Sequence, residues 1–198
     1  MRQALDTAAE LGAPCVYLPP GASDGRRWET LLDVFDDALA PCVAHAAAVG
    51  VALAIEPSAR TQVSFVNTLR DSLLVAERLG PHSRVVVDFA SCWSEREFAG
   101  SIAAFGSRVA LVQVSDIGIG AIRRSEDVAV VSSTPAGRLV PGDGDLELDR
   151  LVQAVLDAGY GGPFELELLG PAIEAEGHAS TLRRAIVATS DLLTRAGA

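Results

Sequence analysis

The chain has 198 residues, a formal net charge of −10 and 49% hydrophobic residues. Its mean hydropathy of +0.28 excludes an intrinsically disordered polypeptide, and its acidic balance argues against a nucleic-acid partner, because phosphate binding needs a basic face. No apolar run reaches the roughly 18 residues of a membrane span, and no signal-peptide-like apolar region follows Met1. We therefore expect a cytoplasmic protein without a membrane partner.

Short apolar runs alternate with longer amphipathic segments, several of which end at a glycine. This alternation is typical of strands that pair in parallel with helices between them. In chain order, the pattern predicts helix 2–12, strand 13–18, helix 28–49, strand 51–56, helix 68–79, strand 84–88, helix 94–105, strand 109–114, helix 146–158, strand 163–168 and helix 177–196. We expect a single domain over residues 1–198, because no linker interrupts these five strand–helix units.

The connection between residues 116 and 144 exceeds the usual length of a strand-to-helix loop, which makes it a candidate lid or binding loop. Within it, Asp116 is interpreted as a structural residue at the start of the loop. The segment Pro141-Gly-Asp-Gly144 predicts a tight turn. The three cysteines, Cys15, Cys42 and Cys92, show no zinc-binding spacing, and their odd number argues against a disulfide framework, so we expect small buried thiols.

Four predicted strands each carry, at or next to their last residue, a side chain that offers an oxygen. These residues are Glu56, Asp88, Gln113 and Glu167. Because parallel strands bring their carboxyl ends to one rim, these side chains are expected to converge. Three carboxylates and an amide oxygen suit a hard divalent cation such as Mn²⁺ or Mg²⁺, with Co²⁺ or Zn²⁺ as alternatives. Glu165 lies one layer deeper in the same strand as Glu167, and is expected to need a polar partner.

Six motifs in a fixed order resemble the sugar phosphate isomerase/epimerase family. They are Ala8-Ala-Glu-Leu-Gly-Ala-Pro14, Leu53-Ala-Ile-Glu-Pro57, Val87-Asp88, Val112-Gln-Val-Ser-Asp116, Arg138-Leu-Val-Pro-Gly-Asp-Gly-Asp145 and Gly159-Tyr-Gly-Gly-Pro-Phe-Glu-Leu-Glu167. The resemblance implies an α/β fold, the xylose isomerase-like TIM (β/α)8 barrel. Five strands do not close a barrel of eight, and the motif order fits strands four to eight, so we expect a partial barrel without the first three strand–helix units.

The same resemblance implies roles for individual residues. Glu56, Asp88, Gln113 and Glu167 fall on the family's metal ligands; many members have His at the position of Gln113, and others, including proteins similar to hydroxypyruvate isomerase, have Gln. Glu56 and Glu167 fall on the acid/base pair of the epimerases. Arg138 resembles a substrate-anchoring arginine.

Two further positions are assigned to the substrate pocket. Ser91 stands where many family members place a histidine that faces the substrate, so it is expected to contact substrate. Trp93 follows a strand near the expected rim, where a pocket wall and ordinary packing are equally open interpretations.

The expected function is a divalent-metal-dependent isomerase or epimerase of a small sugar, sugar phosphate or hydroxy-keto acid, acting through an enediolate intermediate. One alternative is a lyase similar to 3-dehydroshikimate dehydratase, which would use the same metal site. Another is a non-catalytic, truncated paralogue that acts as a binding module. A homodimer is one way to cover the strand edges that a partial barrel leaves exposed.

Overall fold

The computed structural model describes residues 1–119 and 137–198. Five strands form one sheet in the order β1-β2-β3-β4-β5. Strand β1 pairs in parallel with β2, β2 with β3, and β4 with β5. The strands are β1 (Cys15–Leu18), β2 (Ala52–Ile55), β3 (Ser83–Asp88), β4 (Val109–Val114) and β5 (Phe164–Leu166). All five predicted strands are therefore present, and the predicted α/β alternation is confirmed.

The chain divides into two compact units. Unit 1 contains Met1–Val87 and Ser107–Leu111, and unit 2 contains Asp88–Gly106 and Val112–Ala198. The single domain over 1–198 stays a prediction.

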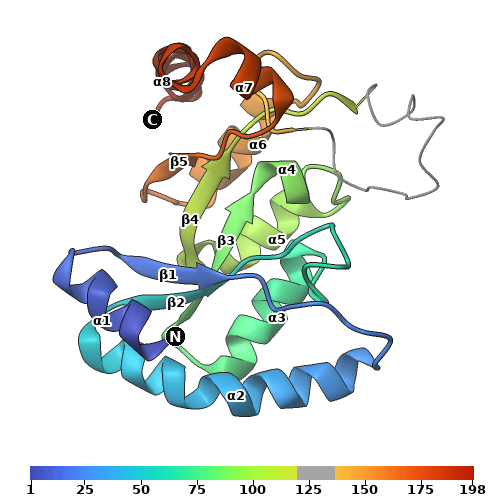
Figure 1. Ribbon diagram of the computed structural model, residues 1–198, viewed down its shortest axis with the longest axis vertical. Coiled ribbons are helices and arrows are strands. Elements are labelled where there is room, and N and C mark those ends of the chain that lie inside the picture. The colour runs from blue at the N-terminus through green and yellow to red at the C-terminus, as the bar shows by residue number, and fades with distance from the viewer. Residues whose placement is uncertain (120–136) are drawn as a thin grey trace. The chain divides into compact units, whose positions relative to one another are not determined.

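Unit 1 contains three helices that pack around β1 and β2. They are α1 (Arg2–Glu10), α2 (Trp28–Val49) and α3 (Leu69–Leu79). Helix α2 contacts α1, α3 and β2, as the blue and cyan ribbon in Figure 1 illustrates. A continuous apolar core joins these elements and includes Leu5, Leu32, Leu53 and Val75. The core of unit 1 thus lies between the strands and the apolar sides of its helices.

The boundaries of the unit 1 helices follow from local chemistry. Helix α2 ends at Gly50, whose φ of 73° is the left-handed conformation that favours glycine. The side chain of Thr68 accepts a hydrogen bond from the backbone N–H of Asp71 at 3.0 Å, which satisfies one free donor at the start of α3. Helix α1 stops at Glu10, two residues before the predicted end at Gly12.

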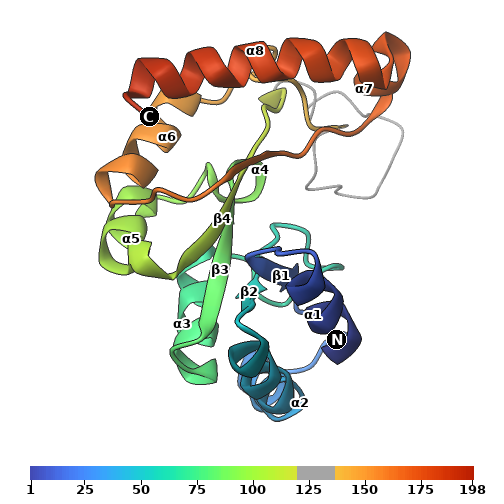
Figure 2. The ribbon, with the colours of Figure 1, turned by 90° about the vertical axis from the view of Figure 1, so that its left-hand side faces the viewer.

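Unit 2 contains a series of helices after β3. They are α4 (Phe89–Cys92), α5 (Phe98–Phe105), α6 (Leu148–Asp157), α7 (Pro171–Glu176) and α8 (His178–Ala196), and a 3-10 turn (Gly106–Arg108) precedes β4. Helix α8 contacts both α6 and α7 (Figure 2). Val140, Ile173 and Ala185 form a small core beneath α7 and α8.

Several sequence-based boundaries in unit 2 are wrong. The helix expected to begin at residue 94 begins at Phe98, and a separate four-residue helix, α4, comes before it. The stretch 116–144 is not wholly irregular, because Asp116 and Leu139 form an antiparallel bridge and Arg138 pairs with Leu169. Residues 120–136, the centre of the proposed lid or binding loop, lie outside the described residues. The turn at 141–144 is confirmed by the 3.0 Å hydrogen bond from the N–H of Asp143 to the carbonyl of Val140.

Only one cysteine matches the expectation of a buried thiol. Cys92 is buried, whereas Cys15 and Cys42 are half-buried. Among the helices of the described residues, none has both the length and the apolar character required to cross a membrane.

Candidate functional site

Asp88 is the last residue of β3, and its carboxylate is fully buried. One oxygen, Oδ1, accepts hydrogen bonds from the backbone N–H of Ala90 at 3.0 Å and from Nη1 of Arg138 at 2.7 Å. The other, Oδ2, accepts a hydrogen bond from the hydroxyl of Ser91 at 2.6 Å. A buried carboxylate is tolerated when it is paired and hydrogen-bonded, and Asp88 has both kinds of contact.

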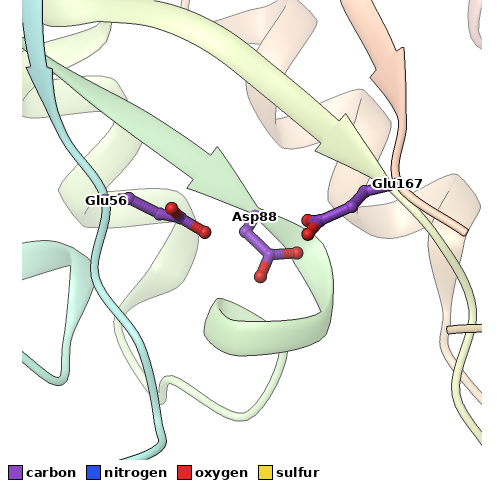
Figure 3. Close-up of side chains that lie close together, drawn as sticks. All are labelled: Glu56, Asp88 and Glu167. Carbon is purple, nitrogen blue, oxygen red and sulfur yellow. The ribbon is translucent and has the colours of Figure 1, made fainter. Parts of the chain in front are cut away.

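Arg138 reaches a second carboxylate with the same nitrogen. Its Nη1 lies 2.8 Å from Oε2 of Glu167, and only 15% of the Arg138 side chain is exposed. Asp88 and Glu167 each offer a carboxylate oxygen within 4.8 Å of the other. Figure 3 shows Asp88 at the end of its strand and Glu167 on the segment just past β5. One cationic nitrogen therefore lies between two of the four predicted ligands.

The backbone around Arg138 explains its position. Its N–H donates to the carbonyl of Leu169 at 2.7 Å, and the N–H of Leu169 donates back at 3.3 Å. The neighbouring Leu139 makes the same reciprocal pair with Asp116. Residue 138 is thereby held beside the segment that follows β5, on which Glu167 lies.

Gln113 lies in β4 and is also fully buried. Its Nε2 donates a 2.9 Å hydrogen bond to Oε2 of Glu165, and the two residues are register partners across the parallel β4–β5 pair. The predicted need of Glu165 for a polar partner is therefore confirmed, and the partner is one of the predicted ligands.

Glu56 belongs to unit 1, where it directly follows β2 and is half-buried. Its backbone N–H donates to the carbonyl of Leu18 at 3.0 Å, which extends the β1–β2 pairing by one residue. The side-chain amide of Asn67 donates hydrogen bonds to the backbone carbonyls of Ser58 and Ser64, both at 2.8 Å. These bonds fix the turn after Glu56. Sequence reasoning did not single out Asn67, because its partners lie in an irregular segment with no periodic pattern.

The remaining predicted residues lie on or beside α4. Ser91 is half-buried and donates its hydroxyl to Asp88. Trp93 follows α4, is half-buried, and donates its backbone N–H to the carbonyl of Phe89 at 3.0 Å. Substrate contact by either residue stays a prediction.

Asp116 organises the loop that follows β4. It is 1% exposed, and its carboxylate accepts hydrogen bonds from the backbone N–H groups of Ile117, Gly142 and Leu146 at 2.9, 3.0 and 3.0 Å. These bonds tie the start of the loop to the turn at 141–144. The interpretation of Asp116 as a structural residue agrees with these contacts.

A family model for the xylose isomerase-like TIM barrel matches residues 1–186. The chain belongs to this family. The resemblance drawn from the six motifs is confirmed at the level of the fold family. A comparison with curated proteins gave no match.

Solved structures of the xylose isomerase-like fold are similar over nearly the whole chain. Protein SMc04130 from Sinorhizobium meliloti 1021 is 26% identical, with a TM-score of 0.79 over 96% of this chain and 69% of that one. The IolI protein, crystallised with a bound zinc atom, is 20% identical, with a TM-score of 0.82 over 98% and 68%. The 3-keto-D-glucoside 4-epimerase YcjR from E. coli is 20% identical, with a TM-score of 0.74 over 98% and 68%. This chain thus matches about two thirds of these barrels, as expected of a partial barrel.

The donor set within unit 2 fits a hard divalent cation. Asp88 and Glu167 supply hard carboxylate oxygens that already share one positive group, the Arg138 guanidinium. A divalent ion prefers the same oxygens. A metal at this pair would lie beside Arg138, so the guanidinium and the ion compete for the same negative charge.

Proposed function

We propose that the chain is a divalent-metal-dependent isomerase or epimerase of a small sugar, sugar phosphate or hydroxy-keto acid, acting through an enediolate intermediate. The observation that carries the proposal is the pair of carboxylates of Asp88 and Glu167, held within 4.8 Å of each other around one cationic nitrogen. Membership of the xylose isomerase-like family and the likeness to an epimerase support the same class of reaction.

We propose Glu56, Asp88, Gln113 and Glu167 as the metal ligands. Glu56 directly follows β2, which pairs in parallel with β3 so that Ile55 lies opposite Val85. Asp88 ends β3, and the carboxyl ends of parallel strands share one edge of a sheet. This register supports Glu56 as the ligand from the neighbouring strand end. Mn²⁺ and Mg²⁺ suit the oxygen-rich donor set best, with Co²⁺ and Zn²⁺ as the next choices.

The proposed chemistry divides between the metal and the carboxylates. When bound, the metal acts as a Lewis acid towards substrate oxygens. Glu56 and Glu167 form the acid/base pair: one carboxylate removes the proton from the carbon between the carbonyl and hydroxyl groups, and the other returns a proton. When the Arg138 guanidinium moves away from the carboxylates of Asp88 and Glu167, it donates hydrogen bonds to a substrate oxygen or phosphate. Ser91 and Trp93 line the substrate pocket.

Proton exchange provides the test. The purified chain with Mn²⁺ is incubated in D₂O with a panel of ketoses and hydroxy-keto acids. NMR follows the incorporation of deuterium at the carbon between the carbonyl and hydroxyl groups. We expect exchange with at least one substrate, and its loss in Glu167→Gln. Glu174→Gln is the matched control, because it makes the same chemical change at an exposed glutamate on α7. Undiminished exchange in Glu167→Gln would overturn the assignment of Glu167.

A second candidate is a non-catalytic binding module of the same fold. The double ion pair of Arg138 favours it, because the guanidinium already compensates Asp88 and Glu167 without a metal. This candidate predicts no stoichiometric metal and no proton exchange with any substrate of the panel. The lyase alternative predicts loss of water from a hydroxy-keto acid, which the same NMR spectra detect.

A further inference from the structure

The hydrogen bond between Gln113 and Glu165 joins a proposed metal ligand to a carboxylate without an assigned role. Gln113 is fully buried in β4, and Glu165 is half-buried in β5. The strands place the two residues directly opposite each other, and Nε2 of Gln113 lies 2.9 Å from Oε2 of Glu165. The contact spans 52 positions of sequence and depends entirely on the register of β4 and β5.

The chemistry of the two groups determines which end of the amide faces Glu165. The oxygens of a carboxylate accept hydrogen bonds, whereas the amide of glutamine carries a donating NH₂ group and an accepting oxygen. The NH₂ group of Gln113 accordingly faces Glu165 and donates to it. The amide oxygen points away from Glu165, and only this oxygen can bind a hard divalent cation.

We propose that Glu165 is a positioning residue that holds the amide of Gln113 with its oxygen directed towards the metal site. The inference rests on the proposed function, in which Gln113 is a metal ligand. Glu165 itself is not a ligand in this account. Its effect on the metal passes through Gln113, in the same way that carboxylates beyond the coordination shell orient the histidine ligands of other metal sites.

The separate partners of Glu165 and Glu167 support this division of roles. Glu165 and Glu167 are two residues apart and therefore project to the same side of the strand. Glu165 bonds the amide of Gln113, whereas Glu167 pairs with the guanidinium of Arg138. Glu167 thus meets a cation, and Glu165 meets a neutral donor that needs a fixed orientation.

The substitution Glu165→Gln tests this role with almost no change in shape. A glutamine at 165 both donates and accepts, so it satisfies Gln113 in either amide orientation. The variant loses the preference for the orientation that offers oxygen to the metal. We expect the Kd for Mn²⁺, measured by isothermal titration calorimetry on the metal-free full chain, to rise about tenfold. Glu174→Gln, an exposed change of the same charge, is expected to leave the Kd unchanged.

A double-mutant cycle separates orientation from simple loss of charge. In a Gln113→Leu background there is no amide to orient, so Glu165→Gln is expected to have no further effect on the Kd. If Glu165→Gln leaves the Kd unchanged while Gln113→Leu raises it, the inference is wrong although the proposed metal site stands. An equal effect of Glu165→Gln in both backgrounds would show that only its charge matters, and would also overturn the inference.

Two controls keep the result interpretable. Thermal unfolding of the metal-free variants shows whether each is folded. If Glu165→Gln does not fold, Glu165→Asp replaces it. This second variant keeps the charge but shortens the reach to Gln113. Glu165→Asp is expected to raise the Kd as well, and an unchanged Kd would contradict the role. If the parent chain does not bind Mn²⁺, the proposed function fails and the inference fails with it.

Discussion

Arg138 holds Asp88 across 50 positions of sequence, with Nη1 of the guanidinium 2.7 Å from Oδ1 of the carboxylate. The same nitrogen lies 2.8 Å from Oε2 of Glu167. Because Asp88 is fully buried, the guanidinium supplies compensating charge where water cannot. A metal ion that binds between Asp88 and Glu167 is therefore repelled by the positive charge of the guanidinium.

Removing the Arg138 charge is therefore expected to strengthen metal binding. In Arg138→Met, a divalent ion no longer competes with the guanidinium for Asp88 and Glu167, and we expect the Kd for Mn²⁺ to fall about tenfold, equivalent to about 1.4 kcal/mol. Arg138→Lys keeps a positive charge and is the control, expected to bind as weakly as the parent. Isothermal titration calorimetry measures both. Weaker binding by Arg138→Met than by the parent would show that Arg138 organises the carboxylates instead of competing with the metal.

The hydroxyl of Ser91 is expected to stabilise the fold through Asp88. It donates a 2.6 Å hydrogen bond to a buried carboxylate, and hydrogen bonds to charged groups contribute about 1.5–3 kcal/mol. Ser91→Ala should lower the free energy of unfolding by about that amount in urea denaturation. Ser94→Ala, at an exposed serine three residues later, should leave it nearly unchanged. Equal stability of the two variants would mean that the Ser91 hydroxyl contributes nothing to holding Asp88.

The loop after β4 should not tolerate a side chain at residue 144. A Cβ added to Gly144 would collide with the carboxylate of Asp116 and would lie 2.5 Å from the carbonyl oxygen of Ile117. Because that carboxylate accepts three backbone N–H groups, it has little room to shift. We expect Gly144→Ala to lower the free energy of unfolding by about 1–3 kcal/mol, as overpacking does. Gly161→Ala, where no atom lies within 4 Å of the added Cβ, is the control for urea denaturation.

The three cysteines should differ sharply in reactivity. Burial, followed by the nearby Glu95 and Asp88 carboxylates, raises the pKa of the Cys92 thiol well above its ordinary value. The thiolate is the reactive form of cysteine, and the raised pKa lowers the fraction of Cys92 in that form. The low thiolate fraction and the burial of the side chain both protect Cys92 in the folded protein. We expect an aromatic disulfide reagent at pH 8 to modify Cys15 and Cys42 before Cys92, which should react only when the chain unfolds. Mass spectrometry of a time course identifies the order, and early labelling of Cys92 would contradict it.

The long helix α2 and the strand β4 could be predicted to the residue, because each has a clear local signal. Helix α2 carries an apolar face from Leu31 to Val43 and ends at a left-handed Gly50. Strand β4 is a short apolar run without competing turn residues. The four-residue helix α4 was missed because it is too short to show periodicity; it depends on the side chain of Asp88, which accepts the N–H of Ala90.

The candidate site was only partly predictable, because several of its contacts join segments that are far apart in the sequence. The chemistry of Asp88 and Glu167 at strand ends follows from sequence order and from the geometry of parallel strands. The contacts of Arg138 with Asp88 and Glu167, and of Gln113 with Glu165, join segments that are far apart in the sequence. The contact between Gln113 and Glu165 also depends on the register of β4 and β5. A slip of one residue in β5 would turn Glu165 away from Gln113, and no local pattern determines that register.

Metal content shows whether the four proposed ligands hold a divalent ion. The purified chain is equilibrated with Mn²⁺, freed of unbound ion, and analysed for metal beside a Glu56→Ala/Glu167→Ala double variant whose folding is checked by circular dichroism. We expect about one divalent ion per parent chain and none in the folded double variant. A parent chain that retains no metal after incubation with excess Mn²⁺ would contradict the proposed metal site, and would favour the binding module in which Arg138 takes the place of the metal.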